Sequence, residues 1–112
     1  MSRTVLNSSV IIALSSLGYL NKLKSLSEKI LIAKAVYEEV CSTGQGLVGE
    51  RELEEAVRTH LIEVKEVKNR LLVIALLDLL AAGEAETIAL AVDEHADQIV
   101  LDDKVARKKP TP

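Results

Sequence analysis

Several acidic residues and one asparagine lie where an apolar run gives way to polar residues, or within a segment of helical pattern. They are Asn7, Glu38, Glu39, Glu84, Glu86, Asp102 and Asp103. Carboxylates packed together repel one another, and their pKa values rise unless a cation neutralises them. Mg²⁺ or Mn²⁺ is the natural cation, because hard ions take oxygen ligands and keep waters for chemistry. Such a site can activate water and clamp a phosphodiester.

Each of these residues also has a purely structural interpretation. An Asp pair after a strand is about as often a turn or a helix cap as a ligand. Acids in the first turn of a helix favour the helix macrodipole by about 0.3–1 kcal/mol, whatever their function. Glu38 and Glu39 alone are typical of a solvated helix face. The residue pattern by itself therefore leaves both the metal site and the structural role open.

The elements that must position these residues are short strands alternating with helices. Buried strands are predicted over residues 4–6, 29–33 and 98–101, and an edge strand within residues 61–68. Apolar spacing predicts helices over residues 10–14, 20–26, 34–41, 49–60, 71–80 and 84–95. This alternation indicates βαβ units, so we expect a three-layer α/β/α fold with a mostly parallel central sheet covered on both faces.

The predicted fold brings the polar positions to one edge. Ligands bind beyond the carboxyl ends of the strands in an open parallel sheet, and two predicted strands end at Asn7 and at Asp102-Asp103. Glu84 and Glu86 begin the helix before the last strand, which places them on the same side of the molecule. We expect Glu38 and Glu39, a turn into their helix, to reach the same rim.

Composition narrows the classes of function. The 112 residues include 14 Lys plus Arg and 17 Asp plus Glu, for a formal net charge of −3. This acidic balance argues against a protein that coats nucleic acid by bulk charge, but not against a nuclease. Tyr19 and Tyr37 are the only aromatic residues, so the core must be aliphatic, and base-stacking platforms are not expected. A P-loop and a Gly-rich dinucleotide fingerprint are both missing, so a nucleotide-binding protein lacks support.

Compartment and membrane signals point to a cytoplasmic protein. Cys41 is the only cysteine, which excludes a disulfide framework and a cysteine zinc site. The first residues lack the basic and apolar regions of a signal peptide. The most apolar stretch, residues 71–82, is shorter than the about twenty residues that a membrane span needs. We therefore expect no membrane association.

Four blocks of the chain resemble those of PIN domains, in the right order and over nearly the whole length. The strand and helix start of residues 4–14 resemble the family's opening, and residues 36–40 its second block. The third and fourth blocks, residues 83–91 and 99–107, are most similar to an uncharacterised prokaryotic, chiefly archaeal branch. The resemblance implies one PIN-like domain over residues 1–107, followed by a flexible tail over residues 108–112.

The resemblance also implies a site and an activity. PIN domains are α/β nucleases that cut RNA with Mg²⁺ or Mn²⁺ held by three or four acids, and many are the toxin of a toxin–antitoxin pair. The matching acidic positions are Asn7, Glu39, Glu84 with Glu86 as its rival, and Asp102 with Asp103 beside it. Ser9 matches a hydroxyl that supports the site, and Lys104 and Arg107 fall where a backbone phosphate of the RNA substrate would be held.

Two departures from the family pattern suggest an alternative. Asn7 offers a carbonyl oxygen without charge, which should weaken Mg²⁺ binding and remove a base for the water. Relatives usually continue past the fourth block, so we expect the last strand and helix of the fold to be missing here. The apolar surface exposed in that way favours a homodimer, a higher oligomer or an antitoxin partner. The alternative is a catalytically degenerate PIN-like protein that acts as a binding or oligomerisation module.

Overall fold

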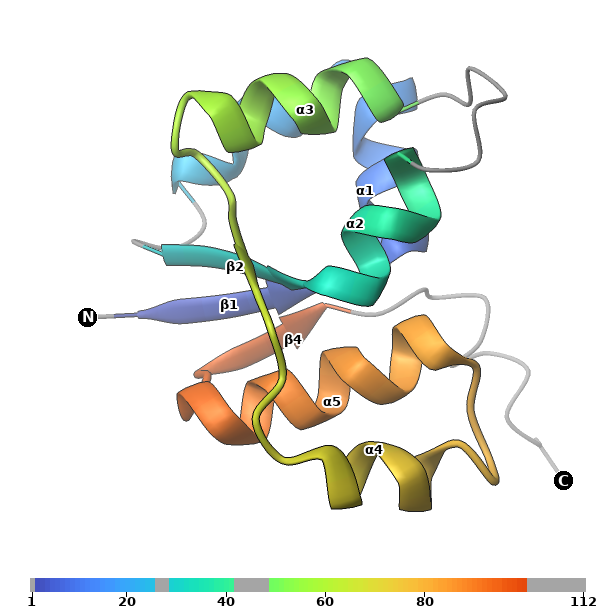
Figure 1. Cartoon of the computed structure of the whole chain (residues 1–112). Coiled ribbons are helices and arrows are strands. Elements are labelled where there is room, and N and C mark those ends of the chain that lie inside the picture. Colours follow the sequence, from blue (N-terminus) through green and yellow to red (C-terminus); the bar gives the residue numbers. More distant parts are fainter. Residues whose placement is uncertain (1, 26–28, 42–48, 101–112) are drawn as a thin grey trace, which may run out of the picture.

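The computed structural model describes residues 2–25, 29–41 and 49–100, and its centre is a parallel sheet (Figure 1). The strands are β1 (Arg3–Leu6), β2 (Lys29–Ala33), β3 (Glu63–Lys65) and β4 (Gln98–Val100). They pair in parallel in the order β3-β2-β1-β4. The predicted parallel sheet is therefore confirmed, and the strand within residues 61–68 lies at an edge, as expected.

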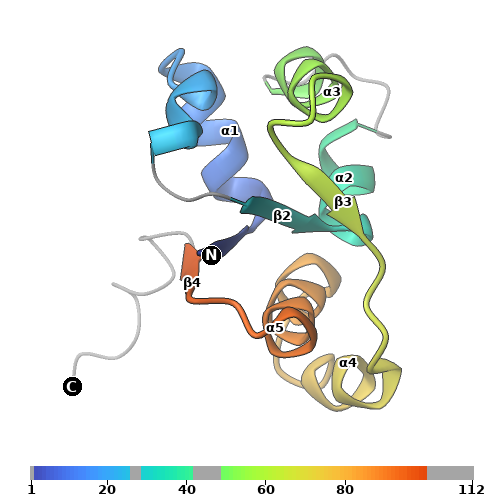
Figure 2. The same ribbon diagram turned by 90° about the vertical axis from the view of Figure 1, so that its left-hand side faces the viewer.

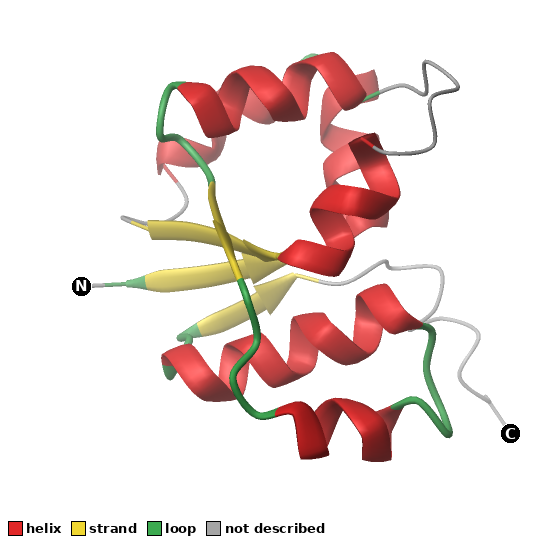
Figure 3. Cartoon of the chain, in the orientation of Figure 1, coloured by secondary structure: helices red, strands yellow, loops and turns green. Residues whose placement is uncertain are grey.

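Helices cover both faces of the sheet. They are α1 (Ser8–Ser16), the 3-10 helix η1 (Leu20–Ser25), α2 (Lys34–Cys41), α3 (Glu50–Arg58), α4 (Arg70–Leu76) and α5 (Ala82–Glu94). Figures 2 and 3 show α1, α2 and α3 on one side of the strands and α4 and α5 on the other. This arrangement is the predicted three-layer α/β/α fold.

The core is aliphatic and is densest around the two central strands. Val5 and Leu6 of β1 and residues 30–33 of β2 are buried, as is typical of parallel strands covered on both faces. Ile11 and Val36 pack onto the sheet from one layer, and Leu90 from the other. The near absence of aromatic side chains is therefore compatible with a closed core.

The prediction of a buried strand over residues 98–101 was wrong for Gln98 and Ile99, and Leu101 lies outside the described residues. Gln98 and Ile99 are exposed, Ile99 by 40% of its surface, because β4 pairs only with β1 among the described strands and lies at the sheet edge. Polar contacts hold its start in place. The Arg3 N–H donates to Asp97 Oδ2 at 2.8 Å, and the Asp97 N–H donates to the Arg3 carbonyl oxygen at 2.9 Å.

Within the described residues, no helix is both long enough and apolar enough to cross a membrane. The apolar segment predicted as a helix over residues 71–80 forms the shorter α4, whose outer side carries exposed side chains. Leu71 and Ile74 are 80% and 61% exposed.

Candidate functional site

The order of the strands determines where a ligand would bind at the carboxyl edge of the sheet. From β1 the chain proceeds outward to β2 and β3, then crosses to β4 on the other side of β1. The direction of strand addition therefore reverses between β1 and β4. In open α/β sheets this switch point is where ligands bind, beyond the carboxyl ends of the strands. Asn7 follows β1 at this point.

Asn7 connects three elements at the switch point. It is 3% exposed, its N–H donates to the Val100 carbonyl oxygen of β4 at 3.4 Å, and its Oδ1 accepts from the Val10 N–H at 3.1 Å. The second contact makes Asn7 the N-cap of α1, a role in which asparagine is among the preferred residues. Its amide oxygen keeps a second lone pair. The predicted ligand position is thus also a structural cap.

Ser9 lies in the first turn of α1, close in sequence to Asn7, and is exposed. Its neighbour Ser8 is the buried serine of this turn. The structure therefore leaves the Ser9 hydroxyl accessible at the edge of the candidate site.

Glu39 reaches from one helical layer to the start of a helix in the other. Its Oε1 lies 2.6 Å from the point where a Cβ on Gly83 would stand. Gly83 is a buried residue in the first turn of α5, and the N-cap residue Ala81 makes no side-chain capping bond. The first N–H groups of a helix lack intrahelical partners and carry partial positive charge. Glycine therefore leaves the room in which a carboxylate can lie against this turn.

Glu84 follows Gly83 in that first turn and is half-buried. No ion pair joins it to another of the described residues. The structure therefore places Glu39 of α2 against Gly83, the residue before Glu84 in α5, although the two segments are distant in sequence.

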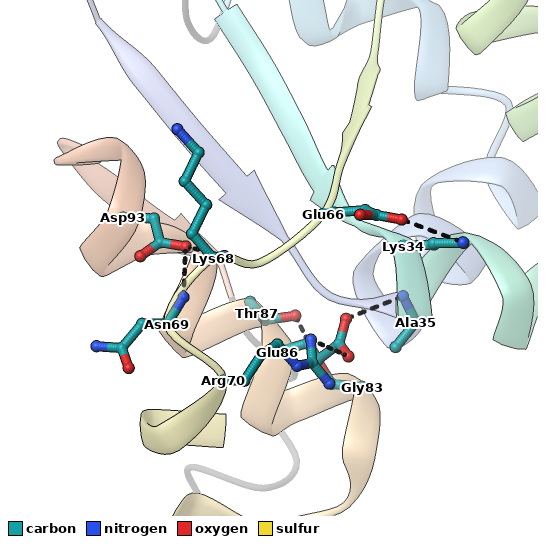
Figure 4. A network of polar contacts seen from close by, with 10 residues as sticks. All are labelled: Lys34, Ala35, Glu66, Lys68, Asn69, Arg70, Gly83, Glu86, Thr87 and Asp93. Carbon is teal, nitrogen blue, oxygen red and sulfur yellow. Dashed lines mark hydrogen bonds and ion pairs between the residues drawn. The ribbon is translucent and has the colours of Figure 1, made fainter. Parts of the chain in front are cut away.

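Glu86, the rival of Glu84, has both carboxylate oxygens in use (Figure 4). Oε1 accepts from the Ala35 N–H at 3.2 Å, and Oε2 pairs with Arg70 Nη1 at 3.1 Å. Only 12% of its side chain is exposed. The two glutamates of the third block thus have different environments, which their spacing in the sequence did not reveal.

A polar pocket of about 310 Å³ lies beside Glu86, where β2 and β3 end. It is lined by Lys34, Ala35, Glu38, Glu66, Val67, Arg70 and Glu86. Lys34 Nζ pairs with Glu66 Oε2 at 3.2 Å, so both cations of this pocket already have carboxylate partners. The pocket is therefore a closed ion-pair network and offers no unpaired cation for a phosphate.

Sequence analysis missed the roles of Gly83 and Arg70. Gly83 separates two helical patterns in the sequence and was expected to lie before the helix, whereas the structure places it inside α5. A glycine between two helical patterns is typical of a break between helices, so no signal in the sequence indicated its contact with Glu39. Arg70 carries no signal either, since its contact with Glu86 depends on the packing of α4 against α5.

The remaining predicted site residues are Asp102, Asp103, Lys104 and Arg107, and they lie outside the described residues. Among the residues that the structure describes, no group of three His, Cys, Asp or Glu side chains is close enough to hold a metal ion.

Burial raises the pKa of the Cys41 thiol on α2, and the carboxylates of Glu54 and then Glu50 raise it further, against a hydrogen bond with Tyr37 that lowers it. The pKa of Tyr37 is raised as well, first by burial and then by Cys41 and Glu54. Both groups therefore stay protonated at neutral pH. An anionic nucleophile on this part of α2 is not supported.

Comparison with curated proteins and with solved structures finds no match. A family model described as a PIN domain matches residues 3–110, which includes all four blocks and every candidate site residue. Because that match spans nearly the whole length, the chain belongs to the PIN-domain family.

Proposed function

We propose that this chain is a Mg²⁺- or Mn²⁺-dependent ribonuclease, with Glu39, Glu84 and Asp102 as the acids of its site. The observation that carries the proposal is the position of the Glu39 carboxylate against the first turn of α5, the turn that contains Glu84. This contact lies at the carboxyl edge of the sheet, where ligands of open α/β sheets bind. The chain also belongs to a nuclease-like family.

The donor chemistry of the edge fits a hard divalent ion. Glu39 and Glu84 offer carboxylate oxygens and Asn7 an amide oxygen, while nitrogen and sulfur ligands are not needed. Asp102, with Asp103 beside it, would complete the acidic set. When bound, the ion supplies Lewis-acid polarisation of the phosphodiester and an activated water. Lys104 and Arg107 would hold the RNA backbone, and Ser9 would support the site with its exposed hydroxyl.

A second function is favoured by one observation at Asn7. Its Oδ1 accepts from the Val10 N–H, and the residue brings no negative charge to the switch point. Coulomb attraction to a divalent ion is therefore weaker than with an aspartate in the same place. The second candidate is a catalytically degenerate PIN-like protein that acts as a binding or oligomerisation module.

A role as the toxin of a toxin–antitoxin pair, in the cytoplasm, is part of the same proposal. It is supported by the family membership and by apolar side chains left exposed on the outer side of α4 and beyond it. Leu71 and Leu79 are 80% and 84% exposed. Exposed apolar side chains of this kind favour an antitoxin partner, a homodimer or a higher oligomer.

The experiment is cleavage of labelled single-stranded RNA by the full chain with Mg²⁺ or Mn²⁺. We expect cleavage that EDTA stops, and that Glu39→Gln and Asp102→Asn abolish. Glu38→Gln is the matched control, because Glu38 is the neighbour of Glu39 on the same helix and both are exposed, and its rate should equal that of the unmodified chain. Cleavage that persists in Glu39→Gln would exclude this site. Metal binding without any cleavage would favour the degenerate alternative.

A further inference from the structure

We infer that Glu86 is a positioning residue that holds α2 against α5 and thereby places Glu39 against Gly83, the residue before Glu84, and that it is not a ligand of the metal. The inference rests on the proposed function, because the metal site that Glu39 would serve is part of that proposal. The contacts between α2, α4 and α5 are features of the fold.

The first observation is that α2 has no cap of its own. β2 ends at Ala33 and α2 begins at Lys34, so no Ser, Thr, Asp or Asn precedes the helix, and its first turn contains no acid. The first N–H groups of a helix need partners from outside it. Glu86 Oε1, from a helix on the other side of the sheet, accepts from the Ala35 N–H at 3.2 Å. The start of α2 is therefore capped by α5.

The second observation is the register between the two helices. Ala35 contacts Glu86, and one turn further along α2 Glu39 lies against Gly83. The later residue on α2 therefore meets the earlier residue on α5. Residues three or four apart share a helix face. The Ala35–Glu86 bond therefore determines which part of α5 faces Glu39.

The third observation is that Arg70 completes the environment of Glu86. Arg70 Nη1 lies 3.1 Å from Glu86 Oε2, and Thr87, next to Glu86, donates its hydroxyl to the Gly83 carbonyl oxygen at 2.7 Å (Figure 4). A carboxylate with little exposure needs such hydrogen-bond partners for its oxygens. With one oxygen on a backbone N–H and the other on a guanidinium, Glu86 serves the helix contact and not an ion.

Three substitutions separate a positioning residue from a ligand. Glu86→Gln keeps an oxygen that can accept from the Ala35 N–H but loses the charge. Glu86→Asp keeps the charge but is one methylene too short for the same bond. Glu86→Ala loses both. A ligand is better replaced by Asp than by Gln, whereas a residue that acts through the Ala35 N–H is better replaced by Gln.

The test is Mn²⁺ titration of the full chain and the three variants by calorimetry. We expect Glu86→Gln to retain the affinity within about threefold, and Glu86→Asp and Glu86→Ala to weaken it by about tenfold or more, as happens when a residue that orients a metal ligand is lost. The opposite order, with Asp retained and Gln weakened, would make Glu86 a ligand. Equal affinity in all four proteins would mean that Glu86 has no part in the site.

A second measurement works without metal. The substitution Glu39→Gln should shift the amide resonance of Gly83, because the carboxylate lies against that residue. We expect the same shift in the Glu86→Gln background and its loss in the Glu86→Asp background. Retention of the shift in both backgrounds would overturn the inference. If the unmodified chain binds no Mn²⁺, the proposed function fails, while this measurement still decides the role of Glu86.

Discussion

The Glu39 carboxylate oxygen Oε1 lies 2.6 Å from the position that a Cβ on Gly83 would occupy, so the two residues cannot both carry a full side chain in this geometry. The glycine therefore keeps space at the start of α5 for an acid from α2. The cost is conformational, because glycine within a helix is less favourable than alanine by about 1 kcal/mol.

Gly83→Ala should weaken metal binding without lowering the free energy of unfolding. The added methyl group displaces the flexible end of Glu39, and its other neighbour, Val36 Cγ2 at 3.8 Å, is at ordinary contact distance. We expect an unchanged or higher free energy of unfolding, by up to about 1 kcal/mol, from the gain in helix propensity. We expect Mn²⁺ affinity to fall by about tenfold, because the carboxylate has left its place. Urea denaturation and calorimetric titration measure the two effects.

The matched control is Gly83→Ala combined with Glu39→Ala. Without the carboxylate the methyl group meets no obstacle within contact distance except Val36, so Gly83→Ala should stabilise the Glu39→Ala background at least as much as the unmodified chain. A loss of stability in both backgrounds would show that Gly83 is required by the packing of the helices, and not by Glu39.

Asn7→Asp should strengthen metal binding without loss of fold. Aspartate is as good an N-cap as asparagine, so the bond from the Val10 N–H is kept. The new charge at the switch point attracts a divalent ion, and we expect Mn²⁺ affinity to rise by about tenfold or more. Calorimetry measures the affinity, and the RNA cleavage assay measures the activity. Unchanged affinity would show that the lost charge at Asn7 is not what limits metal binding.

Asn7→Ala and Asn69→Ala form a matched pair of cap deletions. Each asparagine accepts from the N–H three residues later at 3.1 Å, but Asn7 is buried while Asn69, at the start of α4, is exposed. Loss of an N-cap costs about 0.5–2 kcal/mol. We expect the larger loss for Asn7→Ala, because the Val10 N–H is less able to bond to water instead. Thermal unfolding measures the stability that each variant loses. Equal losses in Asn7→Ala and Asn69→Ala would contradict the expected order.

The sequence predicted the fold well because its central strands are continuous apolar runs. Residues 30–33 of β2 are buried between the two helical layers, and the alternation of strands with helices indicates the parallel sheet. The burial of the last strand was predicted wrongly, since an apolar run such as 99–101 does not tell a central strand from one with a single neighbour.

The candidate site was predictable only in part. Asn7 and Glu39 were placed at the carboxyl edge by the positions of strand ends and helix starts, but the contact of Glu39 with Gly83 in the first turn of α5 depends on how two helices pack after folding. Glu84 and Glu86 could not be told apart, because both begin the same helix. Their difference arises from Ala35 and Arg70, which come from separate elements and meet Glu86 only after folding.

Glu54→Gln should speed the alkylation of Cys41. Burial raises the pKa of the Cys41 thiol, and the negative charge of Glu54 raises it further by disfavouring the thiolate. Removing that charge lowers the pKa, and below its pKa a thiol reacts in proportion to its thiolate fraction. We therefore expect faster reaction with iodoacetamide at mildly alkaline pH, by about twofold at low salt and less at high salt, where the charge is screened. Glu52→Gln on the same helix is the control and should leave the rate unchanged. If Cys41 of Glu54→Gln reacts no faster than Cys41 of the unmodified chain at low salt, an electrostatic contribution of Glu54 is excluded.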